Sequence, residues 1–102
     1  MENTPQNFTE TQGLAKGLVA SDVAIKKKAF LRYVVGSIKN TSTHRFSYLI
    51  VKIDLFEENG KLVANVQSGI ENFERDQTWD FEAGILNDEA VAARVSEIRG
   101  WL

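Results

Sequence analysis

Hydrophobic and polar residues alternate along most of the chain, and this pattern predicts β-strands. The clearest stretch is 46–57 (FSYLIVKIDLFE). One of its faces carries four aliphatic side chains, those of Leu49, Val51, Ile53 and Leu55. The opposite face is mixed, with tyrosine, isoleucine, lysine and aspartate in turn. The aliphatic face is therefore expected to form the centre of the core.

Asn59-Gly60 separates this stretch from a second alternating one at 61–70. Asn-Gly is the strongest short-range signal for a β-hairpin, because both residues tolerate a positive φ. We therefore predict that 46–58 and 61–70 pair antiparallel.

Two further regions have strand patterns. The region 23–40 is rich in valine, isoleucine, phenylalanine and tyrosine, and the region 78–83 places Trp79, Phe81 and Ala83 on one side with acidic residues on the other. Both are expected to be strands, the second with one face buried.

The last segment, 87–100, allows two interpretations. Val91, Val95 and Ile98 have helical spacing and Gly100 would end the helix. Against this, 94–102 also has the pattern of a strand that closes the sheet. We favour one helical turn near 88–92 followed by a strand.

These elements predict an all-β fold, an immunoglobulin-like antiparallel β-sandwich of about six to seven strands with a short helical turn near 88–92. Residues 1–21 hold the only proline of the 102-residue chain and lack periodicity, so we expect a flexible tail or linker there and a domain at 22–102. No signal sequence or anchor is expected, because no charged leader precedes an apolar run and no run could span a bilayer. The same observations predict no direct membrane insertion.

Several motifs resemble those of the FxLYD domain family over 23–101. Its Phe-x-Leu-Tyr-Asp signature corresponds to residues 53–57 (IDLFE), where the leucine matches and three other positions are chemically similar. A Gly-x-x-x-Asn pattern corresponds to Gly36 and Asn40. The family usually carries a Pro-Gly bend before its aromatic strand, and 73–76 (FERD) has neither residue. The positions that carry the resemblance are Gly36, Asn40, Ile53, Leu55, Phe56, Glu57, Gly60, Trp79 and Phe81.

This resemblance implies an immunoglobulin-like sandwich of bacterial and archaeal proteins, often outside the membrane, with no catalytic residue. It implies a non-catalytic accessory or binding module of a bacterial, extracytoplasmic protein. The alternative is an assembly module that pairs through an exposed edge strand with itself or with a partner protein.

The net charge of −2 hides an asymmetry, since 22–52 carries +6 and 53–102 carries −7. Such a split marks either a basic face or basic and acidic strands that neutralise each other as neighbours, and we favour the second interpretation. The expected partner is a protein or a cell-envelope polymer.

Four residues are candidates for an interaction surface. Lys26, Lys28 and Arg32 are interleaved with aromatic residues, as in proteins that bind single-stranded nucleic acid. Three consecutive lysines fall far below a basic domain, so we expect no nucleic-acid partner and favour an edge strand protected by lysine. Trp101 is expected to be partly exposed, where a tryptophan acts as an interaction hot spot.

The remaining polar clusters predict no chemistry. His44 stands in a polar turn without a nucleophile or metal-binding motif around it. Asp54, Glu57, Glu58 and Asn59 crowd oxygens together but match no calcium loop, and the chain has no cysteine. We therefore predict no catalytic residue, no metal and no cofactor.

Overall fold

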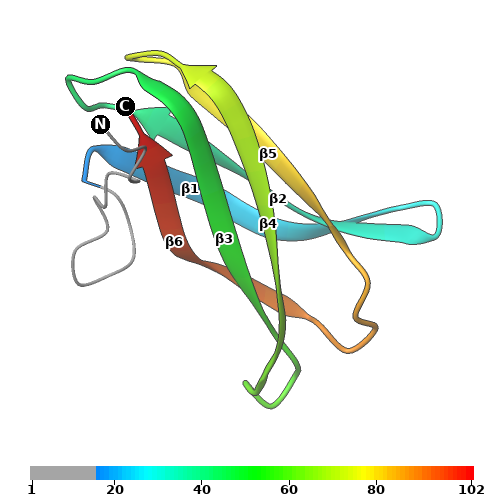
Figure 1. Cartoon of the computed structure of the whole chain (residues 1–102). Coiled ribbons are helices and arrows are strands. Elements are labelled where there is room, and N and C mark those ends of the chain that lie inside the picture. The colour runs from blue at the N-terminus through cyan, green and yellow to red at the C-terminus, as the bar shows by residue number, and fades with distance from the viewer. Residues whose placement is uncertain (1–15) are drawn as a thin grey trace.

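The computed structural model describes residues 16–102, which form two three-stranded antiparallel sheets packed face to face (Figure 1). One sheet has the order β1-β2-β5 and the other has the order β4-β3-β6. This confirms the all-β, sandwich-like prediction. The strands are β1 (Leu18–Lys28), β2 (Leu31–Asn40), β3 (Phe46–Phe56), β4 (Leu62–Phe73), β5 (Thr78–Ile85) and β6 (Ala92–Trp101).

The core lies between the sheets and is centred on β3. The four aliphatic residues of its inner face, at positions 49, 51, 53 and 55, are completely buried, as predicted. Val34 and Ile38 of β2 and Phe81 of β5 belong to the same core cluster. Burial of each such side chain contributes about 1.5–3 kcal/mol, which makes this cluster the main source of stability.

The predicted hairpin is confirmed as β3 and β4, with Leu49 opposite Ile70. Gly60 has a φ of +89° and its N–H donates to the carbonyl of Glu57 at 2.9 Å. We expected Asn59 to contribute through its backbone conformation, but it contributes through its side chain. The side-chain oxygen of Asn59 accepts a hydrogen bond from the N–H of residue 61 at 2.9 Å. Only the glycine takes the left-handed conformation.

The predicted helical turn near 88–92 is wrong. Residues 86–91 connect β5 to β6 without a helix, and β6 begins at Ala92. The guanidinium of Arg32 donates to the carbonyls of Asn87 and Ala90 at 2.6 and 2.5 Å, and the N–H of Val91 donates to the carbonyl of Phe56 at 2.8 Å. Residues of β2 and β3 are therefore hydrogen-bonded to the backbone groups that a helix would need for its own hydrogen bonds. The predicted strand after this segment is confirmed.

The first sheet begins earlier than Asp22. β1 starts at Leu18, which is 4% exposed and lies opposite Asn40. Asp22 has a φ of +56° and sits in a β-bulge between Ser21 and Ala24, so the polar residue that looked like a boundary is an irregularity inside the strand. Of the flexible tail expected at 1–21, residues 18–21 belong to β1, and residues 1–15 lie outside the described residues.

Successive antiparallel strands place their connections at two ends of the sandwich. One end holds 29–30, 57–61 and 86–91, linked by the contacts of Arg32 and Val91 described above. The other end holds 41–45 and 74–77, linked through Asn40.

Candidate functional site

The outer face of the β4-β3-β6 sheet carries a shallow groove. The strand register places Arg99 opposite Ile50, and Gln67 and Glu97 on either side of Lys52. These five residues line a groove of about 210 Å³. We call this surface, together with an aromatic pair at its end, the β3 face; it comprises Tyr48, Ile50, Lys52, Gln67, Glu97, Arg99 and Trp101.

Opposite charges meet in this groove. A guanidinium nitrogen of Arg99 lies 2.6 Å from a carboxylate oxygen of Glu97, whose Cα is in turn opposite that of Lys52. Half of the Arg99 side chain is exposed. An exposed pair of this kind contributes at most about 1 kcal/mol. The carboxylate or carbonyl of a ligand can therefore replace Glu97 as the partner of Arg99 with little loss.

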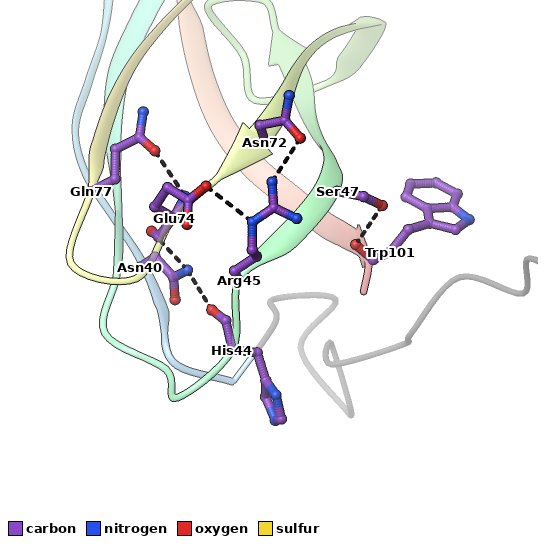
Figure 2. A network of polar contacts seen from close by, with 8 residues as sticks. All are labelled: Asn40, His44, Arg45, Ser47, Asn72, Glu74, Gln77 and Trp101. Atoms are coloured by element: carbon purple, nitrogen blue, oxygen red, sulfur yellow. Dashed lines mark hydrogen bonds and ion pairs between the residues drawn. The ribbon is translucent and has the colours of Figure 1, made fainter.

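Two aromatic side chains lie on the same face. The ring centroids of Tyr48 and Trp101 are 5.8 Å apart with planes inclined by 56°, and Tyr48 is 38% exposed. Tyr48 lies over Gly69, where a Cβ would come within 2.5 Å of the phenol oxygen. Glycine at this strand position lets the ring lie across the sheet. The Ser47 hydroxyl donates to the Trp101 carbonyl at 3.2 Å and fixes the end of β6 (Figure 2).

The four predicted interaction residues do not form one surface. Lys26 and Lys28 are exposed on β1, which is an edge strand of the other sheet. Arg32 directs its guanidinium to two carbonyls of the 86–91 connection and holds that connection in place. Trp101 is half-buried at the end of β6, near the opposite end of the sandwich.

A second hollow, of about 570 Å³, lies at the bulge of β1. Asp22, Lys26, Asp80 and Glu82 are among its lining residues, and the hydroxyl of Ser37 donates to Asp80 at 2.6 Å. This hollow could not be predicted from the sequence, because no local pattern marks the bulge that forms it. Its acidic residues make it less suited to an anionic polymer than the lysines alone suggested.

The positions that resemble the FxLYD family have structural roles here. Ile53, Leu55 and Phe81 are core residues. Gly36 lies against the ring of Phe81, and a Cβ at Gly36 would come within 2.5 Å of it. Phe56 carries the guanidinium of Arg94 over its ring at 5.1 Å from the centroid.

Three other positions that carry the resemblance contribute to core packing or to a turn. Trp79 packs against Phe81 with ring centroids 5.8 Å apart. Glu57 and Gly60 form the β3–β4 turn described above.

Asn40 organises the far end of the sandwich (Figure 2). It is completely buried, and its side-chain amide donates to the carbonyls of His44 at 2.8 Å and Glu74 at 3.1 Å. Its side-chain oxygen accepts hydrogen bonds from the N–H and the hydroxyl of Ser42, at 3.0 and 2.6 Å. One side chain thus joins the β2–β3 connection to the β4–β5 connection.

The bend at 74–77, which lacks the Pro-Gly of the family, is formed by other means. Asp76 has a φ of +65° and its N–H donates to the Asn40 carbonyl at 2.8 Å. The Gln77 side-chain oxygen accepts the N–H of Glu74 at 2.8 Å. An aspartate in the left-handed conformation and a glutamine side chain therefore take the place of glycine and proline.

Within residues 16–102, no group of three or more histidine, aspartate and glutamate side chains is placed to hold a metal ion. In the same part of the chain, no helix is long and apolar enough to cross a membrane.

The β3 face was not among the sites predicted from the sequence. Its signal was present in the alternation of 46–57, which separates Tyr48, Ile50 and Lys52 from the core. The contribution of Arg99 and Glu97 was not visible, because it depends on β6 pairing with β3 through a bulge between Lys52 and the next residue.

Comparisons with protein-family models, curated proteins and solved structures find no match for this chain.

Proposed function

We propose that this chain is a non-catalytic, protein-binding module with an immunoglobulin-like sandwich of the FxLYD type. The strand order supports the topology. In immunoglobulin domains, strands A, B and E share one sheet, and strands C and F, with C′ where present, share the other. The orders β1-β2-β5 and β4-β3-β6 are obtained when β1 to β6 take the places of A, B, C, C′, E and F.

The observation that carries the binding function is the partly exposed Tyr48–Trp101 pair beside Arg99 on the β3 face. Tyrosine, tryptophan and arginine are the residues most enriched in protein interaction hot spots. Here they stand on paired strands of a sheet, where little side-chain or backbone order has to be gained on binding. The neighbouring Lys52 and Glu97 balance each other, which fits a protein surface better than a polyanion.

The partner, in this proposal, is a protein on the outer side of a bacterial membrane. The FxLYD resemblance supports the location, and the mixed charge of the groove supports a protein over a cell-envelope polymer. Protease treatment of intact cells that carry the gene tests the location. Digestion of the full-length protein supports it, and complete protection with an intact cytosolic marker contradicts it.

Photocrosslinking from the β3 face tests the binding function. Tyr48 is replaced by p-benzoylphenylalanine and the protein is irradiated with an envelope extract of the same cells. We expect one protein adduct that unlabelled wild-type chain competes away, whereas the Arg99→Ala/Trp101→Ala variant does not.

The matched control changes the other sheet. Lys26→Ala/Lys28→Ala should compete as well as the wild-type chain, because these side chains are far from the β3 face. Equal competition by both variants, or an adduct with polymer only, would contradict the proposal.

A second function, assembly through an edge strand, is favoured by a separate observation. β4 is a long edge strand whose residues 62–70 carry no charged side chain. Such an edge offers unpaired backbone groups to another strand.

A further inference from the structure

Exposed apolar side chains gather at one end of the sandwich, the end that holds the connections 29–30, 57–61 and 86–91. Single exposed apolar residues are ordinary on protein surfaces, whereas a group of them marks an interaction site. The large apolar residues exposed at this end are Phe30, Leu31, Leu62, Leu86 and Val91. Phe30 is 98% exposed and Leu86 is 96% exposed, so almost nothing in the fold covers either side chain.

Three lysines lie directly behind one of these apolar sites. We call residues 26–31 (KKKAFL), which form the end of the β1–β2 hairpin, the basic tip; all six residues are exposed. In the described part of the chain, none of its three lysines forms an ion pair. The neighbouring Arg32 differs from them, because its guanidinium donates to two carbonyls of the 86–91 connection. The lysines therefore remain available to an external anion.

The strand register gathers the apolar side chains beyond the cations. β2 pairs with β5 as far as Arg32 opposite Ile85, and the residues that follow this pair toward the end of the sandwich are Leu31 and Leu86. Lys28 lies opposite Leu31 on the other side. Figure 1 shows the turn of this hairpin projecting from the sandwich. Phe30 thus lies outermost, and the lysines follow it on the same hairpin.

We propose that the basic tip, together with Leu86, docks onto the surface of an anionic lipid bilayer. This inference goes beyond the protein-binding function and does not depend on it. Phe30 and Leu31 enter the boundary between the lipid headgroups and the acyl chains, and the lysines contact the lipid phosphates. Such a contact is peripheral and requires no membrane-spanning segment.

The order of side chains along the hairpin fits a bilayer better than a nucleic acid or a peptide. A strand rises about 3.3 Å per residue, so the lysines lie within about 10 Å of the turn, comparable to the depth of one headgroup layer. Leu31 and Leu86 have no aromatic face on which a nucleic-acid base could stack. A convex turn also offers no groove or strand edge for a peptide.

Two acidic residues limit which side of this end approaches the bilayer. Asp88 and Glu89 are exposed in the connection that follows Leu86. Their carboxylates repel the lipid phosphates that attract the lysines. The contact is therefore confined to the hairpin side, and removal of these two charges should strengthen it.

Co-sedimentation with vesicles tests the docking. The probes are vesicles of phosphatidylglycerol and phosphatidylcholine in equal parts, and vesicles of phosphatidylcholine alone. We expect the wild-type chain to sediment with the anionic vesicles only, and added salt to weaken this binding. Lys27→Gln/Lys28→Gln should weaken it about 25-fold, because each lysine near an anionic surface contributes about fivefold. Phe30→Ala should weaken it about tenfold through the loss of apolar contact.

Two further variants complete this series. Lys39→Gln removes an exposed lysine at the other end of β2 and is the matched control, which should bind as the wild-type chain does. Asp88→Asn/Glu89→Gln should bind more tightly than the wild-type chain. All of these side chains except that of Phe30 are polar, all are exposed, and unchanged circular dichroism spectra show that the variants are folded.

A fluorescent label reports which end of the sandwich meets the lipid. The chain has no cysteine, so Ala29→Cys gives a single site for a dye whose emission rises in an apolar environment. Emission from position 29 should rise with anionic vesicles. The same dye on Thr43→Cys, an exposed position at the opposite end of the sandwich, should show no change.

Three results would overturn the inference. One is a wild-type chain that does not sediment with anionic vesicles, including a chain that binds a single-stranded oligonucleotide instead. Another is binding that Phe30→Ala leaves unchanged, because the lysines alone would then account for it. The last is a rise in emission from position 43 rather than from position 29. None of these results bears on the β3 face, whose crosslinking is measured separately.

Discussion

Replacement of Asn40 by alanine tests whether one buried amide holds an end of the sandwich together. The side chain makes four hydrogen bonds, two as donor to the carbonyls of His44 and Glu74 and two as acceptor from Ser42. Alanine removes all four. The backbone bonds of residue 40, to Asp76 and Gln77, do not depend on the side chain and should remain.

The expected loss follows from the number of bonds and from their environment. Each neutral hydrogen bond contributes about 1 kcal/mol net, so four set an upper value of about 4 kcal/mol. The loop carbonyls lie where water can reach them once the amide is gone, which recovers part of that value. We expect a loss of about 2–4 kcal/mol, a large share of the roughly 5–15 kcal/mol typical of a small domain. The melting temperature should fall by about 10–20 °C.

Urea unfolding followed by circular dichroism measures this loss, and two variants separate its parts. Ser42→Ala keeps the two donor contacts of Asn40 and one of its acceptor contacts. It also removes the hydrogen bond that the Ser42 hydroxyl accepts from the N–H of His44 at 3.1 Å, so it should cost about 1–2 kcal/mol. Asn40→Asp keeps the size of the side chain but turns a carboxylate oxygen toward two carbonyls. It should be at least as destabilising as alanine at neutral pH, and less so in acid, where a protonated carboxyl can donate one bond.

A loss of less than about 1 kcal/mol for Asn40→Ala would refute the reasoning that four hydrogen bonds are lost, because it would not exceed the contribution of a single bond. Equal stability of the asparagine and aspartate chains at neutral pH would refute the donor assignment.

Three further predictions concern single backbone and loop positions. Gly36→Ala should cost about 1–3 kcal/mol in urea unfolding, because the added Cβ would overlap the Phe81 ring, and a smaller residue at 81 should recover part of the loss. Ala29→Gly should raise stability by up to about 1 kcal/mol, because Ala29 has a φ of +57°, and an unchanged or lower stability would contradict this explanation. Arg32→Met should leave the strands intact but release 86–91, seen as faster limited proteolysis there; an unchanged cleavage rate would show that the two carbonyl contacts do not hold the segment.

The strands of this chain could be predicted well because a strand that buries one face against the core needs alternating hydrophobic and polar residues, and this pattern is visible in the local sequence. The inner face of β3 could be identified from residues two apart, without knowledge of what packs on it. The turn at Gly60 could be identified in the same way, because a positive φ is a property of one residue.

Features that depend on distant partners could not be predicted. The Glu74 carbonyl that Asn40 contacts is 34 residues away in the chain. The contacts of Arg32 with 86–91 span more than 50 residues, and they replace the helix that the local spacing favoured. The β3 face combines an alternation visible in β3 with a β6 register set by a bulge.

The charge asymmetry of the sequence is partly resolved by the register of β3 and β6. Lys52, from the basic half, lies opposite Glu97, and Asp54 lies opposite Arg94. This agrees with neutralisation between neighbouring strands, the interpretation favoured from the sequence. On the other sheet, Lys27 lies opposite Arg32, so the basic hairpin keeps its charge.

That difference gives the two sheets opposite tendencies to associate. A second copy that approached the β1 edge would bring the lysines at 26–28 against their own counterparts, and like charges in facing strands oppose pairing. At the β4 edge, residues 62–70 carry no charged side chain, so no such repulsion opposes pairing there. One electrostatic rule therefore predicts that association of this chain, if driven by strand pairing, proceeds through β4. High salt should leave pairing at the β4 edge unchanged while reducing the repulsion that protects β1. A dimer strengthened by salt would therefore point to the β1 edge.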